Sequence, residues 1–278
     1  MNALYKRLLT AFAGIPLLLY LANKGHWFFF ALTLFIALVS AGEFLAACQG
    51  RGVRTNVALV LCGVAAASLF AKMCAGKGQI PLAALLPVSL WLLFSIFCVL
   101  RADVNILHRV PVKVLTIICL GILPAHLILL RDLIGSFQLL GREWDLGFFM
   151  IIWLYLVVWG TDTGAYVIGT LIGKRRIFPV VSPNKSLEGL LGGLSLGVLL
   201  GMACGSLLFH DWLKLLVSAL ITSLAAVYGD LFASLLKRAL SIKDFGEVLP
   251  GHGGILDRFD SLIMAAPAAY ICIRLFFR

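Results

Sequence analysis

The sequence predicts an all-α protein, a polytopic transmembrane helix bundle with about nine spans and its N-terminus in the cytoplasm. Of its 278 residues, 62% are hydrophobic and only 13% are charged, and the mean hydropathy is +1.03. Soluble domains contain about 25% charged residues. Apolar stretches also recur along the whole chain, each near the ~20 residues that a helix needs to cross a bilayer. The chain is therefore expected to form one integral-membrane unit.

Five apolar stretches fill the first half, and we interpret them as spans. They cover residues 8–22, 27–47, 57–71, 80–100 and 114–130. Pro87 and Pro124 fall inside the last two, where a proline is expected to kink the helix. The region 131–146 is polar and carries Trp144, which predicts an interfacial loop. A cleaved signal peptide is the alternative for the start, but the next span follows within a few residues and no small-residue cleavage site separates them.

Two ionisable residues, Glu43 and His126, lie inside these five apolar stretches. Glu43 lies near the end of the second span, and an acidic group within a span is a functional candidate. Its place near the boundary fits a paired structural role equally well. His126 stands alone in an apolar run, and we interpret it as a hydrogen-bonded packing residue. Residues 1–146 are therefore predicted to be N-terminal transmembrane scaffold helices, and 147–278 the catalytic transmembrane region.

The second half carries four further spans, at residues 147–173, 187–209, 213–236 and 259–277. The first of them contains Asp162 above a row of glycines, where another helix backbone can approach closely. The loop 182–186 follows, with Lys185 just before a helix start. Small residues and a lysine at that position suit a phosphate, although Ser-Pro-Asn is also an ordinary helix cap.

The most informative stretch is 228–261, which gathers charged residues of both signs in an otherwise apolar chain. If 213–236 is helical, Asp230 and Lys237 share one face of that helix. Asp257 and Asp260 then follow one turn apart at the start of the last span. Three carboxylates from two helices provide the oxygen ligands that Mg²⁺ prefers, and nearby Lys and Arg suit phosphate oxygens. The spacing predicts metal-dependent phosphate chemistry at a membrane surface.

The positions of Lys and Arg predict the orientation of the bundle. If the nine spans alternate, 15 of the 23 Lys and Arg fall on the N-terminal side and 8 on the other. Positive residues collect on the cytoplasmic side, so the 182–186 loop and most of 228–261 are expected to face the cytoplasm, where nucleotide is available. The net charge of +10 has the same explanation, and nucleic acid is not an expected partner.

The 228–261 stretch closely resembles the signature of the phosphatidate cytidylyltransferase (CDP-diacylglycerol synthase) family. Every spacing of that signature is kept by Ser234, Lys237-Arg238, Lys243-Asp244, His252-Gly253-Gly254, Asp257-Arg258 and Asp260. A second matching segment includes Asp162, Tyr166, Ser182, Lys185-Ser186 and Glu188-Gly189. Asn184, Leu187 and Phe245 depart from the commoner family residues, and we expect these departures to touch only the rim of the site.

This resemblance implies a Mg-dependent nucleotidyltransferase that transfers the cytidylyl group of CTP to phosphatidic acid, giving CDP-diacylglycerol and pyrophosphate for phospholipid synthesis. It implies catalytic roles for Asp230, Lys237, Arg238, Lys243, Asp244, His252, Asp257, Arg258 and Asp260. It implies substrate binding by Asp162, Ser182, Lys185, Ser186, Ser234, Gly253 and Gly254. The expected metal ligands are Asp230, Asp257 and Asp260, with room for a second metal or a monovalent cation, and His252 is expected to be a ligand or loop organiser rather than a base.

The expected partners are CTP, phosphatidic acid and membrane lipids, and the glycine-rich spans would permit a homodimer. The expected location is the bacterial inner membrane, with the active site facing the cytoplasm. Two alternatives stay open. A CTP-dependent polyprenol or phytol kinase has a similar Gly- and Asp-bearing span, and a cation-coupled transporter could use acidic groups within spans as an ion relay.

Overall fold

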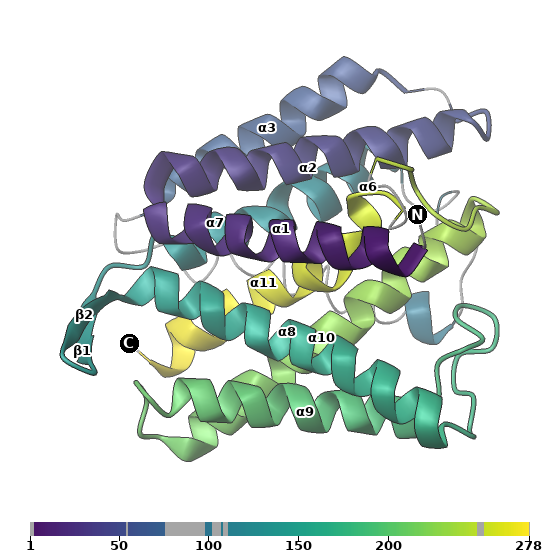
Figure 1. Cartoon of the computed structure of the whole chain (residues 1–278). Helices are drawn as coiled ribbons and strands as arrows, with labels where there is room; N and C mark the ends of the chain where they lie inside the picture. The colour runs from purple at the N-terminus through teal and green to yellow at the C-terminus, as the bar shows by residue number, and fades with distance from the viewer. Residues whose placement is uncertain are drawn as a thin grey trace.

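The computed structural model describes residues 3–53, 55–75, 98–101, 107, 111–248 and 253–277, with side chains at Phe12 and from Gly14 onward. Long helices dominate this part of the chain (Figure 1). The first half contains α1 (Ala3–Lys24), α2 (His26–Gln49), α3 (Val57–Cys74), α6 (Val112–Thr116), the π-helical turn η1 (Ile117–Ile122) and α7 (Leu123–Arg131). The second half contains β1 (Ser136–Leu139), β2 (Arg142–Asp145), α8 (Leu146–Ile172), α9 (Leu187–Gly205), α10 (Trp212–Ala239) and α11 (Leu256–Phe276).

Seven helical segments of the described chain are long and apolar enough to cross a membrane. They are His26–Gln49, Val57–Cys74, Val112–Arg131, Leu146–Ile172, Leu187–Gly205, Trp212–Ala239 and Leu256–Phe276. The predicted helical membrane bundle is thus confirmed to that extent. The predicted span 8–22 lies within α1, which is helical but not among these seven, and most of the predicted span 80–100, with Pro87, lies outside the described residues.

The predicted interfacial loop 131–146 contains a β-hairpin at residues 136–145. Strands β1 and β2 pair antiparallel, with Phe137 opposite Trp144. The turn consists of Leu140 and Gly141, both with positive φ (53° and 72°), as a tight two-residue hairpin turn of the primed type requires. This hairpin is hard to predict from the sequence, since leucine is an unusual residue at the first of these turn positions.

Short polar residues begin four of the long helices. A side-chain oxygen of Asn56 accepts a hydrogen bond from a first-turn backbone N–H of α3, and Asp145, Ser186 and Asp211 do the same for α8, α9 and α10. Such caps satisfy N–H groups that have no partner within the helix, and each contributes about 1 kcal/mol. The start of each of these spans is therefore encoded locally.

Pro124 and His126 lie in the span Val112–Arg131. A π-helical turn, η1, ends two residues before Pro124, and such turns accommodate interruptions of the regular hydrogen-bond ladder. The kink at Pro124 stays a prediction. His126 is buried, with Nδ1 2.9 Å from the carbonyl oxygen of Ile122. Its predicted role as a hydrogen-bonded packing residue is confirmed.

Helices α8 and α9 pack closely through glycines, as the glycine row after Asp162 predicted. The buried residues of α9 are glycines at every fourth position, from Gly189 to Gly205. A Cβ at Gly193 would lie 2.6 Å from the carbonyl oxygen of Thr161, and one at Gly164 would lie 2.6 Å from that of Gly192. The α9 glycines pack against α8 of the same chain, so they give no support to the predicted homodimer. The homodimer stays a prediction.

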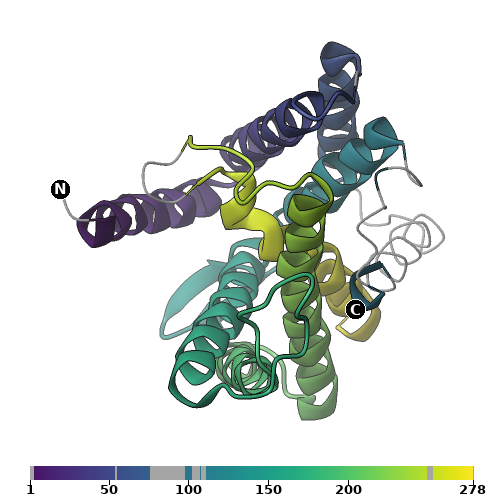
Figure 2. The ribbon, with the colours of Figure 1, turned by 90° about the vertical axis from the view of Figure 1, so that its right-hand side faces the viewer.

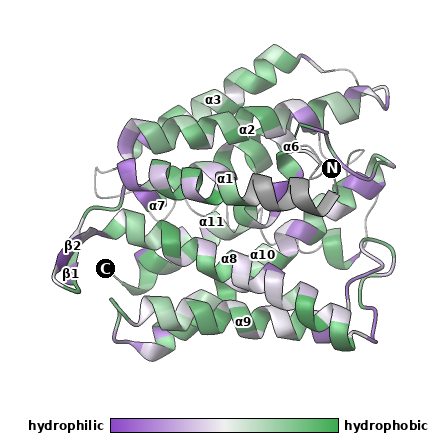
Figure 3. Ribbon diagram, in the orientation of Figure 1, coloured by the Kyte–Doolittle hydropathy of each residue, from purple (hydrophilic) through white to green (hydrophobic). Residues whose placement is uncertain are grey.

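The loops that carry the predicted site lie together at one end of the bundle. Helices α8 and α10 end there, α9 and α11 begin there, and the N-terminus and the α2–α3 turn lie at the same end (Figures 1 and 2). The β-hairpin and the C-terminus lie at the opposite end. Hydrophilic residues gather mainly toward these two ends (Figure 3). The two predicted site segments, although far apart in sequence, are thus brought to one side.

Candidate active site

Three carboxylates come together where α8, α10 and α11 meet. Asp230 on α10 interacts electrostatically with both Asp162 on α8 and Asp260 on α11. The Lys185 ammonium lies 2.7 Å from an oxygen of Asp230, and the Ser261 hydroxyl lies 3.3 Å from an oxygen of Asp162. We call Asp162, Asp230 and Asp260, with Lys185, the acidic cluster.

The acidic cluster brings three carboxyl groups on membrane-spanning helices together with a single lysine from a loop. Like charges at close range repel, and ionisable groups near lipid are costly unless they are paired, wet or bound to a cation. The groups of the cluster that could bind a metal ion are all carboxylate oxygens, which suits a hard cation such as Mg²⁺. Within the described residues, however, no three acidic, His or Cys side chains are already gathered in a metal-binding arrangement. The donor chemistry therefore fits Mg²⁺, and a preformed cage is not seen in this part of the chain.

Asp257 has a different environment from the other carboxylates, because both of its oxygens are occupied. One oxygen accepts from the Lys237 ammonium at 2.8 Å, and the other accepts from the backbone N–H groups of Phe245 at 2.9 Å and Gly254 at 3.1 Å. The Asp257 side chain is 4% exposed. In this geometry Asp257 fastens the loop after α10 onto the start of α11. Its predicted role as a metal ligand stays a prediction.

The loop between α8 and α9 is fastened by hydrogen bonds of its own. The Ser186 hydroxyl accepts from the N–H of Gly189, and one Glu188 oxygen accepts from the N–H groups of Lys174 and Arg175 at 3.0 and 3.2 Å. The Arg238 guanidinium donates to the carbonyl of Val181 at 3.3 Å, which joins this loop to the end of α10. Lys185 is thereby held where it reaches Asp230.

Comparison with known proteins identifies a family and several curated relatives. A profile of the cytidylyltransferase family matches residues 5–276. The chain belongs to that family. Curated relatives include phosphatidate cytidylyltransferases of Staphylococcus haemolyticus and Staphylococcus aureus, each 46% identical over 132 residues, and of Staphylococcus saprophyticus, 45% identical over 132 residues. Each match covers 46% of this chain and 50% of the relative, so the matched region spans about half the length of the curated relatives.

Six exposed basic residues of this family member form a group that we call the basic rim. It comprises Lys174, Arg175, Arg176, Arg238, Lys243 and Arg258. All of them lie on or beside the two loops at the site end of the bundle. A reaction between two phosphate-bearing substrates needs such charge, because positive side chains offset the repulsion between anions.

The other predicted site residues differ in how deeply they are buried and in what they contact. Ser234 is buried in α10, and the side chain of Asp244 lies beside Gly253, whose φ is +79°. Ser182 is partly buried in the loop before α9. His252 lies outside the described residues.

Phe245 corrects one expectation, since it does not lie at the rim. It is 6% exposed, and its ring packs edge-on against Phe44 of α2, with centroids 6.0 Å apart. The Lys237 ammonium lies 5.5 Å from the centroid of the same ring. An aromatic residue here is therefore part of the core beneath the site, and its N–H contributes to holding Asp257.

Glu43 is the residue whose role the sequence left open. Its side chain is buried, and its two oxygens accept from the N–H groups of Ile255 and Leu256, each at 2.9 Å. The acidic residue near the end of the second span is thus paired with the first turn of α11. A lone acidic residue in a span signals a partner, but nothing in the sequence specifies which backbone provides it.

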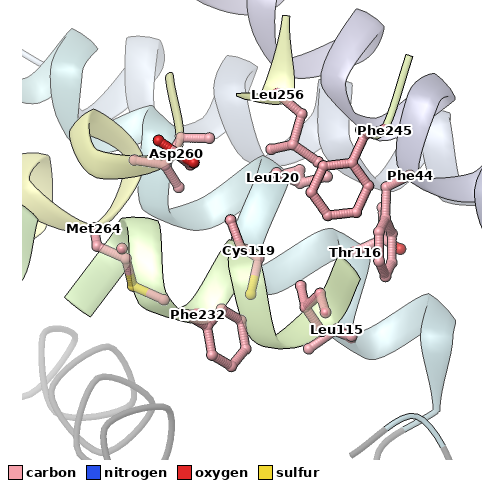
Figure 4. Close-up of a pocket in the computed structure, with 14 residues that line it drawn as sticks. Phe44, Leu115, Thr116, Cys119, Leu120, Phe232, Phe245, Leu256, Asp260 and Met264 are labelled. Carbon is pink, nitrogen blue, oxygen red and sulfur yellow. The ribbon is translucent and has the colours of Figure 1, made fainter. Parts of the chain in front are cut away.

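An apolar cavity extends from the acidic cluster into the bundle (Figure 4). Its wall includes Asp260 and Gly229, the neighbour of Asp230, and continues over side chains from α2, α6, η1, α10 and α11. In Figure 4 Cys119, Phe232, Phe44 and Leu115 surround the apolar part, and the Asp260 carboxylate lies at one side of it. A polar group at the margin of an apolar cavity suits a ligand with one charged and one apolar end.

Proposed function

We propose that this chain transfers the cytidylyl group of CTP to phosphatidic acid, giving CDP-diacylglycerol and pyrophosphate. The observation that carries the proposal is the acidic cluster, which lies close to loops that carry exposed basic residues, in a membrane protein of the cytidylyltransferase family. The names of the curated relatives support this substrate pair.

In the proposed reaction, an oxygen of the lipid phosphate attacks the α-phosphorus of CTP, and the bond from that phosphorus to the bridging oxygen of pyrophosphate breaks. The attacking phosphate is already ionised, so no strong general base is needed. The residues must instead hold two anions in line and offset their charge. Lys185 lies inside the cluster and would contact a phosphate there, while rim residues such as Arg238 and Arg258 would hold the triphosphate and the departing pyrophosphate.

The same proposal includes Mg²⁺, held by Asp230 and Asp260 with Asp162 beside them. When bound, the ion supplies positive charge to the phosphate oxygens. Asp230, which pairs with Lys185 in the structure, would be a ligand of the ion, and Lys185 would bind a phosphate. Asp257 would keep Lys237 and the loop after α10 in place.

The apolar cavity beside Asp260 supports a lipid as one of the two substrates. A phosphate at the acidic cluster would leave the adjoining acyl chain next to an opening lined by apolar side chains. We also propose that the site end of the bundle faces the cytoplasm of a bacterial inner membrane, because most Lys and Arg fall on that side. Both loops and the N-terminus at one end of the bundle fit this orientation.

The proposal is tested by identifying the product of purified protein given CTP, Mg²⁺ and dioleoyl phosphatidic acid. Mass spectrometry should find CDP-diacylglycerol in the lipid fraction. If an added polyprenol or phytol is phosphorylated instead, the kinase alternative replaces the proposal. A transporter is disfavoured because the predicted site residues gather toward one end of the bundle (Figure 1) and come from one half of the chain. A lack of any CTP-dependent product would revive it.

A further inference from the structure

Glu43 lies on α2, in the half of the chain that the sequence marks as scaffold, yet it contacts the helix that carries two site carboxylates. Its two oxygens each accept one backbone hydrogen bond, from Ile255 and Leu256, at 2.9 Å. These N–H groups lie at the first turn of α11, where no partner within the helix exists. A carboxylate at a helix N-terminus also interacts favourably with the helix dipole.

Two glycines leave room for the Glu43 carboxylate. A Cβ at Gly254 would lie 2.5 Å from one oxygen, and a Cβ at Gly246 would lie 2.7 Å from the other. The next residue of α2, Phe44, packs on Phe245 of the same loop, and Figure 4 shows Phe44, Phe245 and Leu256 beside one another. Two consecutive residues of α2 therefore hold both the loop before α11 and the first turn of α11.

We propose that Glu43 is a positioning residue for the reaction: from α2 it fixes the first turn of α11, and so sets where Asp257 and Asp260 stand relative to Asp230 and Lys237. Leu256 is adjacent to Asp257 in the chain and one turn before Asp260. A shift of that turn moves both carboxylates together, while Asp230, on α10, stays in place. This inference rests on the proposed function for its activity readouts and on the structure alone for its exchange readout.

The direct test is Glu43→Gln, which keeps the size of the side chain but turns one acceptor into a donor that faces a backbone N–H. Hydrogen exchange, measured by mass spectrometry on peptides covering 253–262, should become about 10-fold faster or more, since a hydrogen bond to a charged group is lost. In the cytidylyltransferase assay, the Mg²⁺ concentration for half-maximal activity should rise about 10-fold, and kcat should fall about 10–100-fold. Both the kcat and the Mg²⁺ dependence are measured on folded protein, and the amount of folded protein is determined by size-exclusion chromatography.

Arg131→Gln is the matched control, because Arg131 is another buried charge that joins the N-terminal helices to the rest of the bundle. Its guanidinium donates to the carbonyl oxygen of Ala22 at 2.5 Å and to Asp145 at 2.8 Å, at the opposite end from the site. We expect this variant to be less stable but to keep the wild-type exchange at 253–262 and the wild-type Mg²⁺ dependence. Equal shifts in both variants would overturn the proposal, because they would reflect general destabilisation.

Gly246→Ala is the second variant, in case Glu43→Gln does not fold. It retains the charge but places a methyl group against the Glu43 carboxylate, so exchange at 253–262 and the Mg²⁺ requirement should shift in the same direction by a smaller factor. Unchanged exchange in Glu43→Gln, or in Gly246→Ala if that variant alone folds, would refute the positioning role. If the wild-type protein makes no CDP-lipid, the proposed function fails, and the exchange result still decides whether Glu43 fixes α11.

Discussion

Lys185 and Asp230 form an ion pair, with 2.7 Å between the ammonium nitrogen and a carboxylate oxygen. The pair joins the loop before α9 to α10 and leaves both side chains partly exposed, at 26% and 37%. We predict that Lys185→Met lowers kcat/KM by about 10²–10³-fold, the usual loss when one charge-stabilising donor is removed. Its thermal stability in detergent should change little, because exposed ion pairs contribute about 0–1 kcal/mol.

Lys214→Met is the control for that prediction. Lys214 pairs with Asp211 at 2.9 Å at the start of α10, away from the site end. Its loss should leave both activity and stability near wild type. Equal activity losses in the two variants would contradict a specific role for Lys185.

Asp230→Asn and Asp257→Asn should differ in stability even though both are expected to abolish turnover. The Asp257 carboxylate pairs with Lys237 at side-chain exposures of 4% and 13%. Removing one partner of a buried pair costs about 3 kcal/mol, so Asp257→Asn should unfold at a clearly lower temperature in detergent than Asp230→Asn. Wild-type turnover in both variants would contradict the site assignment.

Removal of divalent cations should abolish turnover, and Mg²⁺ should restore it. The reason is that the carboxylates of the acidic cluster repel one another and both substrates unless a cation offsets their charge. Asp260→Asn should raise the Mg²⁺ concentration for half-maximal activity, measured by titration after chelation with EDTA. Full activity in EDTA would show that the cluster works without a divalent ion.

The apolar cavity predicts a dependence on the acyl chain. Cys119 is 6% exposed and lines the cavity, so Cys119→Phe should fill part of it. We expect the KM for dioleoyl phosphatidic acid to rise about 10-fold, roughly the effect of 1.4 kcal/mol of lost apolar burial, with a much smaller change for a dihexanoyl analogue. Cys62→Phe, at an exposed position of α3, is the control. An equal change for both lipids would show that the cavity does not receive the chain.

Much of the fold could be predicted because membrane spans are encoded by length and hydrophobicity. The helices α8 and α10 match their predicted spans closely, and Asp145 and Asp211 mark their starts through local caps. The hairpin at 136–145 could not be predicted, since its turn depends on positive φ at Leu140 rather than on a typical turn residue.

In the candidate site, too, features set by spacing along one helix could be predicted, whereas contacts between residues distant in sequence could not. Spacing along α10 and α11 identified Asp230 and Asp260, and the glycines after Asp162 indicated the close packing of α8. The backbone partners of Asp257 and Glu43 could not be predicted, because backbone N–H groups carry no sequence signature. Glu43 lies 212 residues from Ile255 in the chain, and only the packing of α2 on α11 brings them together.

The central claim is cytidylyl transfer to a lipid phosphate, and CTP labelled separately at the α- and γ-phosphorus tests it most directly. Purified protein in detergent would receive phosphatidic acid, Mg²⁺ and each labelled CTP in turn, with Asp230→Asn as the inactive control. The α-label should enter the lipid fraction, and the γ-label should leave as pyrophosphate. Transfer of the γ-label to a lipid, or α-label in the lipid fraction at the same rate with Asp230→Asn, would contradict the account.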